Sequence, residues 1–202
     1  MREKVRTKGD LSVTSESHQE AIRQGESYFK PKSQNVLDKY KGKSDEEIKT
    51  ILQQTANPFA VCFEHWIGDF NMGTGIRNAN GFNAKKVYYL GDKKWDRRSA
   101  VGVHNYTDVE WIPTIEDFMN LQDEYTIVGI DNVPGAVPLS SYQFVENTLF
   151  VFGEEGVGLT PAMQSMCKNI VEIPMYGSVR SFNCGVASGI IMHEFVSRFK
   201  KV

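Results

Sequence analysis

The stretch Phe152-Gly153-Glu154-Glu155-Gly156-Val157-Gly158 decides how this chain folds. It overlaps the end of the apolar run Leu149–Phe152, so its glycines are expected where a buried strand turns into a loop. Glycine tolerates positive φ and lets a ligand approach backbone amides and carbonyls closely. Such a loop predicts a ligand pocket at the end of a buried strand, with a purely structural glycine turn as the alternative.

Two better-known glycine motifs do not fit this stretch. A dinucleotide-binding GxGxxG motif belongs at the first strand–helix turn of its unit, with an acidic residue about 20 positions later. Here the glycines follow the fourth apolar run of the chain, and no Gly-Lys-Ser/Thr follows them to complete a phosphate-binding loop. The order of the motifs therefore disfavours a Rossmann dehydrogenase.

The rest of the chain alternates apolar runs with helix-like segments. Continuous rather than alternating apolar runs favour strands of a parallel sheet that is covered on both faces. Together with the intervening helices they predict an α/β fold. Strands are expected at Phe59–Phe63, Val87–Leu90, Thr126–Ile130, Leu149–Phe152 and Val171–Ile173, and helices at about 44–55, 74–82, 115–121, 161–167 and 184–199.

The composition limits the classes of function. At 202 residues, with 41% hydrophobic residues, the chain fits one domain with a short appendage. We expect an N-terminal basic and helical arm over residues 1–56 and the main domain over 57–202. The three cysteines form no CxxC pair, so neither a zinc site nor a disulfide framework is predicted. No apolar run approaches the roughly 18 residues of a membrane span, and a cytoplasmic location is expected.

Charge is unevenly distributed along the chain. The net charge is −2, but residues 1–43 carry +4 and the remainder −6. A further basic cluster is formed by Lys85, Lys86, Lys93, Lys94, Arg97 and Arg98. Contacts to phosphates depend on local rather than net charge, so the arm and this cluster predict a site for a polyanion such as RNA; solvated loop charges are the alternative.

Two more segments carry polar groups beside glycine turns. The first, Asn71-Met72-Gly73, leads to Arg77, whose guanidinium could bind a phosphate or a developing oxyanion or lie on the surface. The spacing allows Asn71 and Arg77 to point into one pocket. The second, Ile173-Pro174-Met175-Tyr176-Gly177, leads to Ser181-Phe182-Asn183 at the start of the last helix. Ser181 or Asn183 could simply cap that helix.

Together these segments resemble the TrmH (SpoU) family of SPOUT methyltransferases, which methylate ribose 2′-hydroxyls of RNA. The resemblance covers about residues 57–200. It rests on three motifs: Asn71-x-Gly73-x-x-x-Arg77 with Phe82, Phe152-Gly153-Glu154-Glu155-x-x-Gly158, and Ile173-Pro174-Met175-x-Gly177-x-x-x-Ser181-Phe182-Asn183 with Glu194. The chain departs from the family where Glu154 replaces the usual asparagine, Phe182 the usual leucine and Asn83 a glycine.

The resemblance implies a parallel sheet with helices on both faces and a deep C-terminal trefoil knot. It also implies S-adenosylmethionine as cofactor and a homodimer with the last helix in its interface. No metal is expected, because neither the cysteines nor the histidines have metal-binding spacing. The implied cofactor-binding residues are Leu90, Gly153, Glu154, Gly158, Ile173, Met175 and Phe182. The implied catalytic residues are Arg77, Asn71, Glu155, Ser181 and Asn183.

Several functions remain open at this point. RNA is the expected substrate because only RNA offers a 2′-hydroxyl. The short arm favours tRNA, and the alternatives are an rRNA 2′-O-methyltransferase, a non-catalytic RNA-binding module and a base-directed SPOUT enzyme. The apolar stripe of the last helix (Ala187, Ile191, Phe195) suits either a dimer interface or the core of the same chain.

Overall fold

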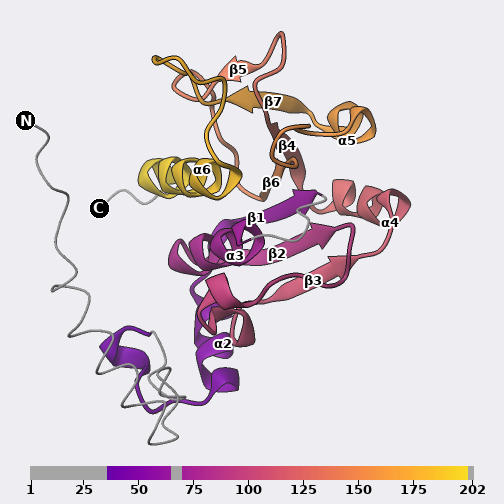
Figure 1. The fold of residues 1–202 in the computed structure, drawn as a ribbon. Helices are drawn as coiled ribbons and strands as arrows, with labels where there is room; N and C mark the ends of the chain where they lie inside the picture. The colour runs from indigo at the N-terminus through magenta and orange to yellow at the C-terminus, as the bar shows by residue number, and fades with distance from the viewer. Residues whose placement is uncertain (1–35, 65–69, 200–202) are drawn as a thin grey trace, which may run out of the picture. The chain divides into compact units, whose positions relative to one another are not determined.

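The computed structural model describes residues 36–64 and 70–199, which form a parallel sheet with the strand order β3-β2-β1-β6-β4-β7-β5 (Figure 1). Each pair of neighbouring strands is parallel. The predicted α/β fold is therefore confirmed. The strands are β1 Asn57–Glu64, β2 Ala84–Leu90, β3 Val109–Ile112, β4 Thr126–Ile130, β5 Val137–Pro138, β6 Thr148–Phe152 and β7 Asn169–Glu172.

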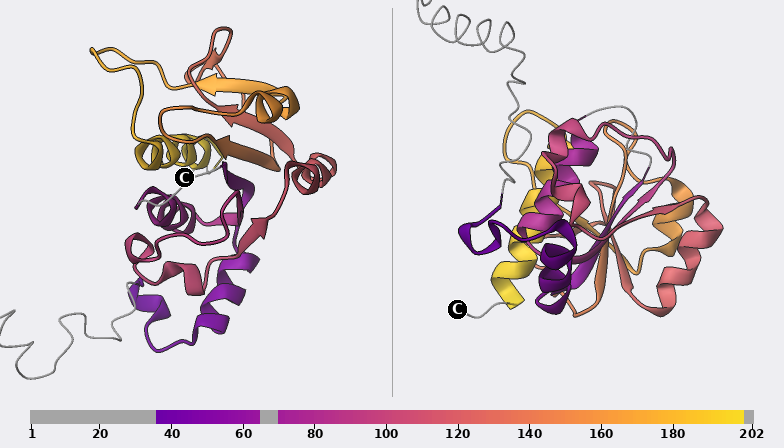
Figure 2. Two further views of the ribbon diagram at one scale, coloured as in Figure 1. Left: turned by 45° about the vertical axis from the view of Figure 1, so that its right-hand side comes forward. Right: turned by 90° about the horizontal axis from the view of Figure 1, so that it is seen from below.

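Helices cover both faces of the sheet, as Figure 2 shows from below. Helices α2, α3 and α6 lie on one face, and α4 and α5 lie on the other. The helices are α2 Asp45–Gln54, α3 Asn71–Gly81, α4 Ile115–Met119, α5 Pro161–Met166 and α6 Cys184–Phe199. Short 3₁₀ turns connect them: η1 Asp38–Tyr40, η2 Arg98–Ala100, η3 Val103–Asn105 and η4 Asn120–Asp123.

Alternate residues of the central strands enter separate cores on the two faces. On one face Phe59 of β1 and Phe150 of β6 pack against Phe195 of α6, with ring centroids 4.9 and 5.5 Å away. On the other face Ala60 and Cys62 of β1 join a buried cluster with Phe118 of α4. Continuous apolar runs are what a sheet buried on both faces requires.

The stripe of α6 belongs to the core of its own chain. Ile191 and Phe195 have no exposed surface, and the Phe195 ring stacks on Phe199 with centroids 4.4 Å apart. The sequence left open whether this stripe forms a dimer interface or the core of its own chain, and in the structure Ile191 and Phe195 belong to the core. Ala187 is only partly buried.

Helix α2 belongs to the main compact unit, which begins at Leu37. It begins with a capping box, because Glu47 N donates to Ser44 Oγ and Ser44 N donates to Glu47 Oε2. Ile48 is 1% exposed, so the helix packs by an apolar residue. This one buried side chain explains why a helix that otherwise looks polar belongs to the main compact unit, although the sequence grouped it with the arm of residues 1–56. Residues 1–35 of the predicted arm lie outside the described residues.

Two short strands were not predicted. In β3, Glu110 interrupts the apolar run, and the strand lies at an edge of the sheet. β5 has only two residues and ends with Pro138, so it carries no apolar periodicity. The trefoil knot expected from the resemblance stays a prediction.

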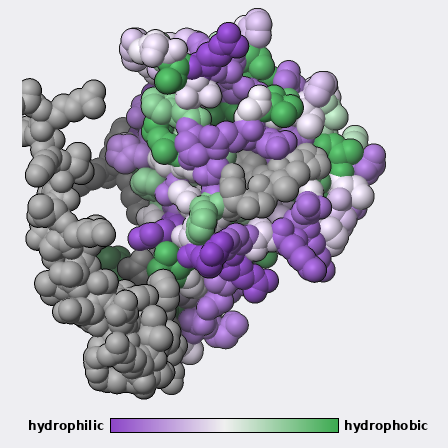
Figure 3. Space-filling view, in the orientation of Figure 1, coloured by the Kyte–Doolittle hydropathy of each residue, from purple (hydrophilic) through white to green (hydrophobic). Residues whose placement is uncertain are grey.

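Figure 3 shows hydrophobic residues on the visible face only in small, separate groups. Within the described residues, no helix combines the length and the apolar character that crossing a membrane needs.

Candidate active site

A cavity of about 380 Å³ opens at the carboxyl ends of β4, β6 and β7. From β1 the chain continues to β2 and β3 on one side, whereas β6 and β4 lie on the other side of β1. Ligands of open α/β sheets bind beside the carboxyl ends of strands where the strand order reverses in this way. The volume lies in the range of small-molecule sites.

The cavity gathers the predicted cofactor residues, apart from one. Its lining includes Gly153, Glu154, Gly158, Ile173, Met175 and Phe182. Leu90 is absent from the lining and is 4% exposed in the core cluster beneath α4. The end of β2 lies two strands from β6, which explains why this residue is not brought to the cavity.

The glycine loop is a tight turn that needs its glycines. Glu154 and Gly158 form an antiparallel bridge, with Gly158 N donating to Glu154 O at 2.9 Å. A Cβ on Gly153 would lie 2.2 Å from the carbonyl carbon of Gly158, and Gly158 itself has φ +77°. A larger side chain at Gly153 would push the two arms of the loop apart, whereas one at Gly158 would strain the backbone and meet the carboxylate of Asp131.

Asp131 and Asn132, which follow β4, hold two of the cavity loops in place. Asp131 Oδ2 accepts from Leu159 N at 2.9 Å, at the end of the glycine loop. Asn132 Nδ2 donates to Arg180 O at 2.6 Å, in the segment before α6. Sequence reasoning missed this pair. The sequence did contain an indication of it, because two polar residues directly follow the buried run Thr126–Ile130, just as the glycine loop directly follows β6.

The three predicted motifs meet at one carboxylate oxygen. Glu155 Oε2 accepts from Asn71 Nδ2 at 2.7 Å and from Asn183 Nδ2 at 2.9 Å. Asn183 also donates to Asn71 Oδ1 at 3.0 Å, and its own Oδ1 accepts from Val186 N at 3.3 Å. Asn183 thus caps α6 and joins the polar cluster at the same time, so its two alternative roles are combined.

Arg77 lies outside this cluster and outside the cavity lining. Residues of an α-helix are turned by about 100° each, so Asn71 and Arg77 project on different sides of α3. The expectation that both point into one pocket of this chain is wrong for that reason. Arg77 is exposed and makes no hydrogen bond or ion pair with any described residue.

The neighbours of α3 define where Arg77 points. On one side, a Cβ on Gly73 would lie 2.1 Å from Ser99 Oγ, which shows how closely η2 approaches the helix. On another side, Asn78 Nδ2 donates to Gly185 O of α6 at 2.8 Å. Arg77 follows Gly73 by four residues, so it projects from the open ridge beside η2.

Ser181 lines the cavity and is exposed. The structure thus places Glu155 and Ser181 at the cavity, links Asn71 and Asn183 to it through Glu155, and leaves Arg77 at a distance.

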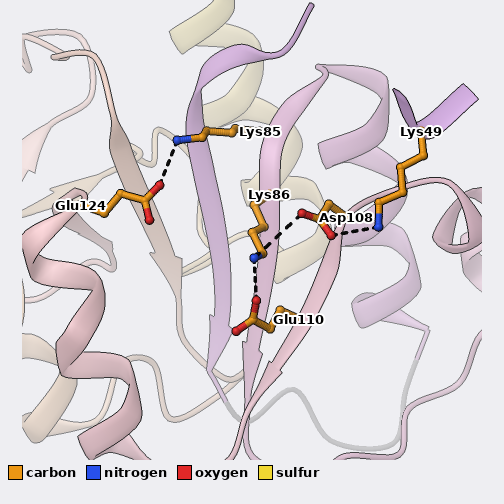
Figure 4. A network of polar contacts seen from close by, with 6 residues as sticks. All are labelled: Lys49, Lys85, Lys86, Asp108, Glu110 and Glu124. Carbon is orange, nitrogen blue, oxygen red and sulfur yellow. Dashed lines mark hydrogen bonds and ion pairs between the residues drawn. The ribbon is translucent and has the colours of Figure 1, made fainter. Parts of the chain in front are cut away.

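The predicted basic cluster divides into paired and unpaired residues. Figure 4 shows a network at the start of β2. Lys85 Nζ lies 2.9 Å from Glu124 Oε1, and Lys86 Nζ lies 2.6 Å from Glu110 Oε2. Lys86 also approaches Asp108, which binds Lys49 on its other side. Carboxylates that already offset these lysines weaken the predicted attraction for a polyanion here.

Cysteine chemistry and metal chemistry have no support near the cavity. Burial raises the pKa of the Cys62 thiol well above its usual value and that of Cys167 to about 12, so both stay protonated. Cys184 lines the cavity, where its thiol lies 3.7 Å from Glu155 Oε2. Within residues 36–64 and 70–199, no group of three His, Cys, Asp or Glu residues is placed to hold a metal ion.

A known protein family matches the part of the chain that contains all three motifs. The model of the SpoU rRNA Methylase family matches residues 58–193, which is more than half of the chain. Relatives include the 23S rRNA (guanosine-2′-O-)-methyltransferase RlmB of Acinetobacter baylyi, 24% identical over 159 residues. RlmB of Haemophilus ducreyi is 27% identical over 158 residues. These matches cover 75% and 74% of this chain but only 64% of either relative.

Solved structures share the fold. The SpoU methyltransferase AviRb from Streptomyces viridochromogenes, in complex with the cofactor AdoMet, superimposes with a TM-score of 0.64 at 26% identity, over 70% of this chain and 58% of that one. The A. aeolicus TrmH/SpoU tRNA modifying enzyme gives 0.68 at 20% identity, over 76% and 81%.

Proposed function

The chain belongs to the SpoU rRNA Methylase family, and from this we propose that it transfers a methyl group from S-adenosylmethionine to a ribose 2′-hydroxyl of RNA. The observation that carries the proposal is the convergence of three distant motifs on Glu155, at the mouth of the cavity. The AdoMet complex of the similar AviRb structure supports the choice of cofactor.

The residues present fit S-adenosylmethionine. Phe152, Ile173 and Met175 offer apolar surface, and the glycine loop offers backbone groups to a nucleoside. Asp131, Glu154 and Glu155 add carboxylates, whereas Arg180 is the one lysine or arginine among the lining residues that the structure describes. An acidic lining suits a donor whose methyl group is carried on a positively charged sulfonium, already reactive toward an oxygen nucleophile.

The protein's part in the reaction is to position the hydroxyl and to stabilise the charge that develops on it. We assign Arg77 to a phosphate of the bound substrate, because its guanidinium is exposed, lies outside the cofactor cavity and has no partner among the described residues. Arginine stays protonated in proteins, so it does not act as the base. The proton passes to a phosphate oxygen or to water.

The remaining motif residues act as positioning groups. Glu155 and Asn183 order the glycine loop against the start of α6, and Asn71 ties α3 to both. Ser181, exposed at the cavity mouth, is assigned to the RNA backbone.

Ribosomal RNA is the substrate class that we propose. The relatives that match in sequence are named as 23S rRNA enzymes, whereas the tRNA modifying enzyme is similar at only 20% identity. This replaces the preference for tRNA drawn from the sequence.

We also propose that the chain acts as a homodimer. Hydrophobic side chains are exposed around the cavity loops and the start of α6, with Tyr176 95%, Val179 61% and Val186 51% exposed. Light scattering of the purified chain tests this directly, since a monomeric mass at micromolar concentration would contradict it.

The decisive experiment has two readouts. Calorimetry measures the affinity for S-adenosylmethionine, and labelled methyl transfer to ribosomal RNA followed by alkaline digestion maps the product. A 2′-O-methyl group blocks cleavage at its own bond, so one resistant dinucleotide is expected.

The alternatives give different results. Label on a base without a resistant bond would identify a base-directed enzyme. RNA binding without any affinity for S-adenosylmethionine would identify a non-catalytic module.

A further inference from the structure

The six residues of the predicted basic cluster divide between the two edges of the sheet. Lys85 and Lys86 lie at the start of β2, which is its amino end. Lys93, Lys94 and Arg97 follow the end of the same strand at Leu90. Because all neighbouring strands are parallel, this second group shares the carboxyl edge of the sheet with the cavity. The first group lies at the opposite edge.

The residues Gly91–Arg97, here called the docking loop, present cations that carboxylates do not neutralise. Lys93, Lys94 and Arg97 are exposed and form no ion pair within residues 36–64 and 70–199. This sets them apart from Lys85 and Lys86, each of which is paired with acidic residues (Figure 4).

Two cations of the docking loop rest on tryptophan rings, one on Trp111 of β3 and one on Trp95 of the loop itself. Lys93 Nζ lies 4.8 Å from the ring centroid of Trp111, and Arg97 Cζ lies 5.9 Å from that of Trp95. Trp111 Nε1 donates to Gly91 O at 2.9 Å, which ties the start of the loop to β3. A cation resting on an aromatic face keeps its N–H donors available for an anion.

Arg98, the next residue, has a different role. Its guanidinium binds Asp96 with several hydrogen bonds and lowers the pKa of that carboxyl to about 2. This local pair fixes the turn into η2 and removes Arg98 from the set of free cations.

The docking loop lies within reach of the cavity. Neighbouring strands are about 4.8 Å apart, so the end of β2 is roughly 10 Å from the end of β6, two strands away. The loop continues into η2, which packs on α3 on the side of Gly73 from which Arg77 projects. The docking loop and the cavity therefore lie at the same edge of the sheet, and η2 connects the loop to the side of α3 that carries Arg77.

We propose that the docking loop binds the phosphate backbone of the RNA segment that flanks the methylated nucleotide, through Lys93, Lys94 and Arg97. This inference rests on the proposed function for the identity of the polyanion. Three exposed cations in one loop, none of them paired with a carboxylate of the described residues, suit contacts to the phosphates of one strand.

The chain offers a matched pair of variants for the test. K93A/K94A removes two lysines from the docking loop, and K85A/K86A removes two lysines from the same strand's other end. Binding of the full-length proteins to a fluorescein-labelled single-stranded RNA, about 12 nucleotides long, is followed by anisotropy between about 50 and 200 mM salt.

We expect K93A/K94A to bind the RNA about tenfold more weakly at the lowest salt, and R97A to weaken it further. The slope of log affinity against log salt should fall by about 1.4, since each phosphate contact to a single strand contributes about 0.7. K85A/K86A should stay within about twofold of the parent, because its lysines are already paired. Equal weakening by both double variants, or none by K93A/K94A, overturns the proposal.

Calorimetry separates this result from the proposed function. K93A/K94A should retain the parent's affinity for S-adenosylmethionine. In methyl transfer its KM for RNA should rise, whereas its KM for S-adenosylmethionine should not change. If the parent binds the RNA but not S-adenosylmethionine, the proposed function fails while the docking loop is still tested by the same pair of variants.

Discussion

The side-chain amide of Asn71 donates a 2.7 Å hydrogen bond to Glu155 Oε2, although 84 positions separate the two residues in the chain. Asn183 donates to the same oxygen at 2.9 Å. A carboxylate accepts several hydrogen bonds at once, so one Glu155 side chain orders α3, the glycine loop and the start of α6. Because the cluster is exposed, each bond contributes about 1 kcal/mol or less to folding. Its role is to position the loops.

We expect Glu155→Gln to reduce methyl transfer at least tenfold while lowering the melting temperature only slightly. The change keeps the shape of the side chain but replaces the carboxylate by an amide, which has one uncharged acceptor oxygen and one NH₂ group. Asn71 and Asn183 therefore lose their charged hydrogen-bond acceptor. Steady-state kinetics and thermal unfolding measure the two effects. Glu116→Gln, at an exposed residue of α4, is the control; equal losses in both variants would argue against a positioning role.

We expect Arg77→Ala to abolish methyl transfer and to leave affinity for S-adenosylmethionine and thermal stability close to those of the parent. The guanidinium contacts no described residue by a hydrogen bond or an ion pair and does not line the cavity. Arg77→Lys should recover little activity, because an ammonium lacks the planar fork that binds phosphate. Activity of Arg77→Ala within a few fold of the parent contradicts this assignment.

The sequence was informative where chemistry and periodicity coincide. Continuous apolar runs predicted β1, β2, β4, β6 and β7, because a sheet covered on both faces needs them. The glycine motif located the loop at the cavity, since only glycine allows the approach of Gly153 to Gly158.

Contacts that depend on tertiary structure were not predictable. The pairing of Lys86 with Glu110 follows from parallel register between β2 and β3, and β3 itself was missed. The separation of Arg77 from Asn71 follows from the start of α3 at Asn71 rather than at residue 74, which places both residues on one helix. Sequence spacing limits such contacts without determining them.

We expect Glu154→Gln to reduce the ratio by which the cavity binds S-adenosylmethionine more tightly than its demethylated product. Glu154 lines the cavity and forms no ion pair with a described residue. Methyl transfer removes the positive charge of the sulfonium, so a carboxylate several ångströms away favours the donor over the product by about three- to tenfold. Calorimetry with both ligands measures the ratio of their dissociation constants.

The control for this prediction is Glu154→Asp, which keeps the charge. It should keep most of the ratio, although affinity for both ligands falls with the shorter side chain. A ratio unchanged in Glu154→Gln would show that this carboxylate does not distinguish donor from product.

Two glycines of the cavity loops should differ sharply in their tolerance of a methyl group. A Cβ on Gly153 would lie 2.2 Å from the Gly158 carbonyl carbon, which belongs to the backbone and has no rotamer to change. Gly177 has no heavy atom within 4 Å of the same position and no positive φ.

We expect Gly153→Ala to lower the free energy of unfolding by about 3 kcal/mol, to lower the melting temperature by about 10 °C, and to abolish cofactor binding. Gly177→Ala should change stability by less than about 0.5 kcal/mol, as surface substitutions usually do. Thermal unfolding and calorimetry of the two variants compare them directly, and a Gly153→Ala protein as stable as Gly177→Ala would mean that the glycine loop does not close as described.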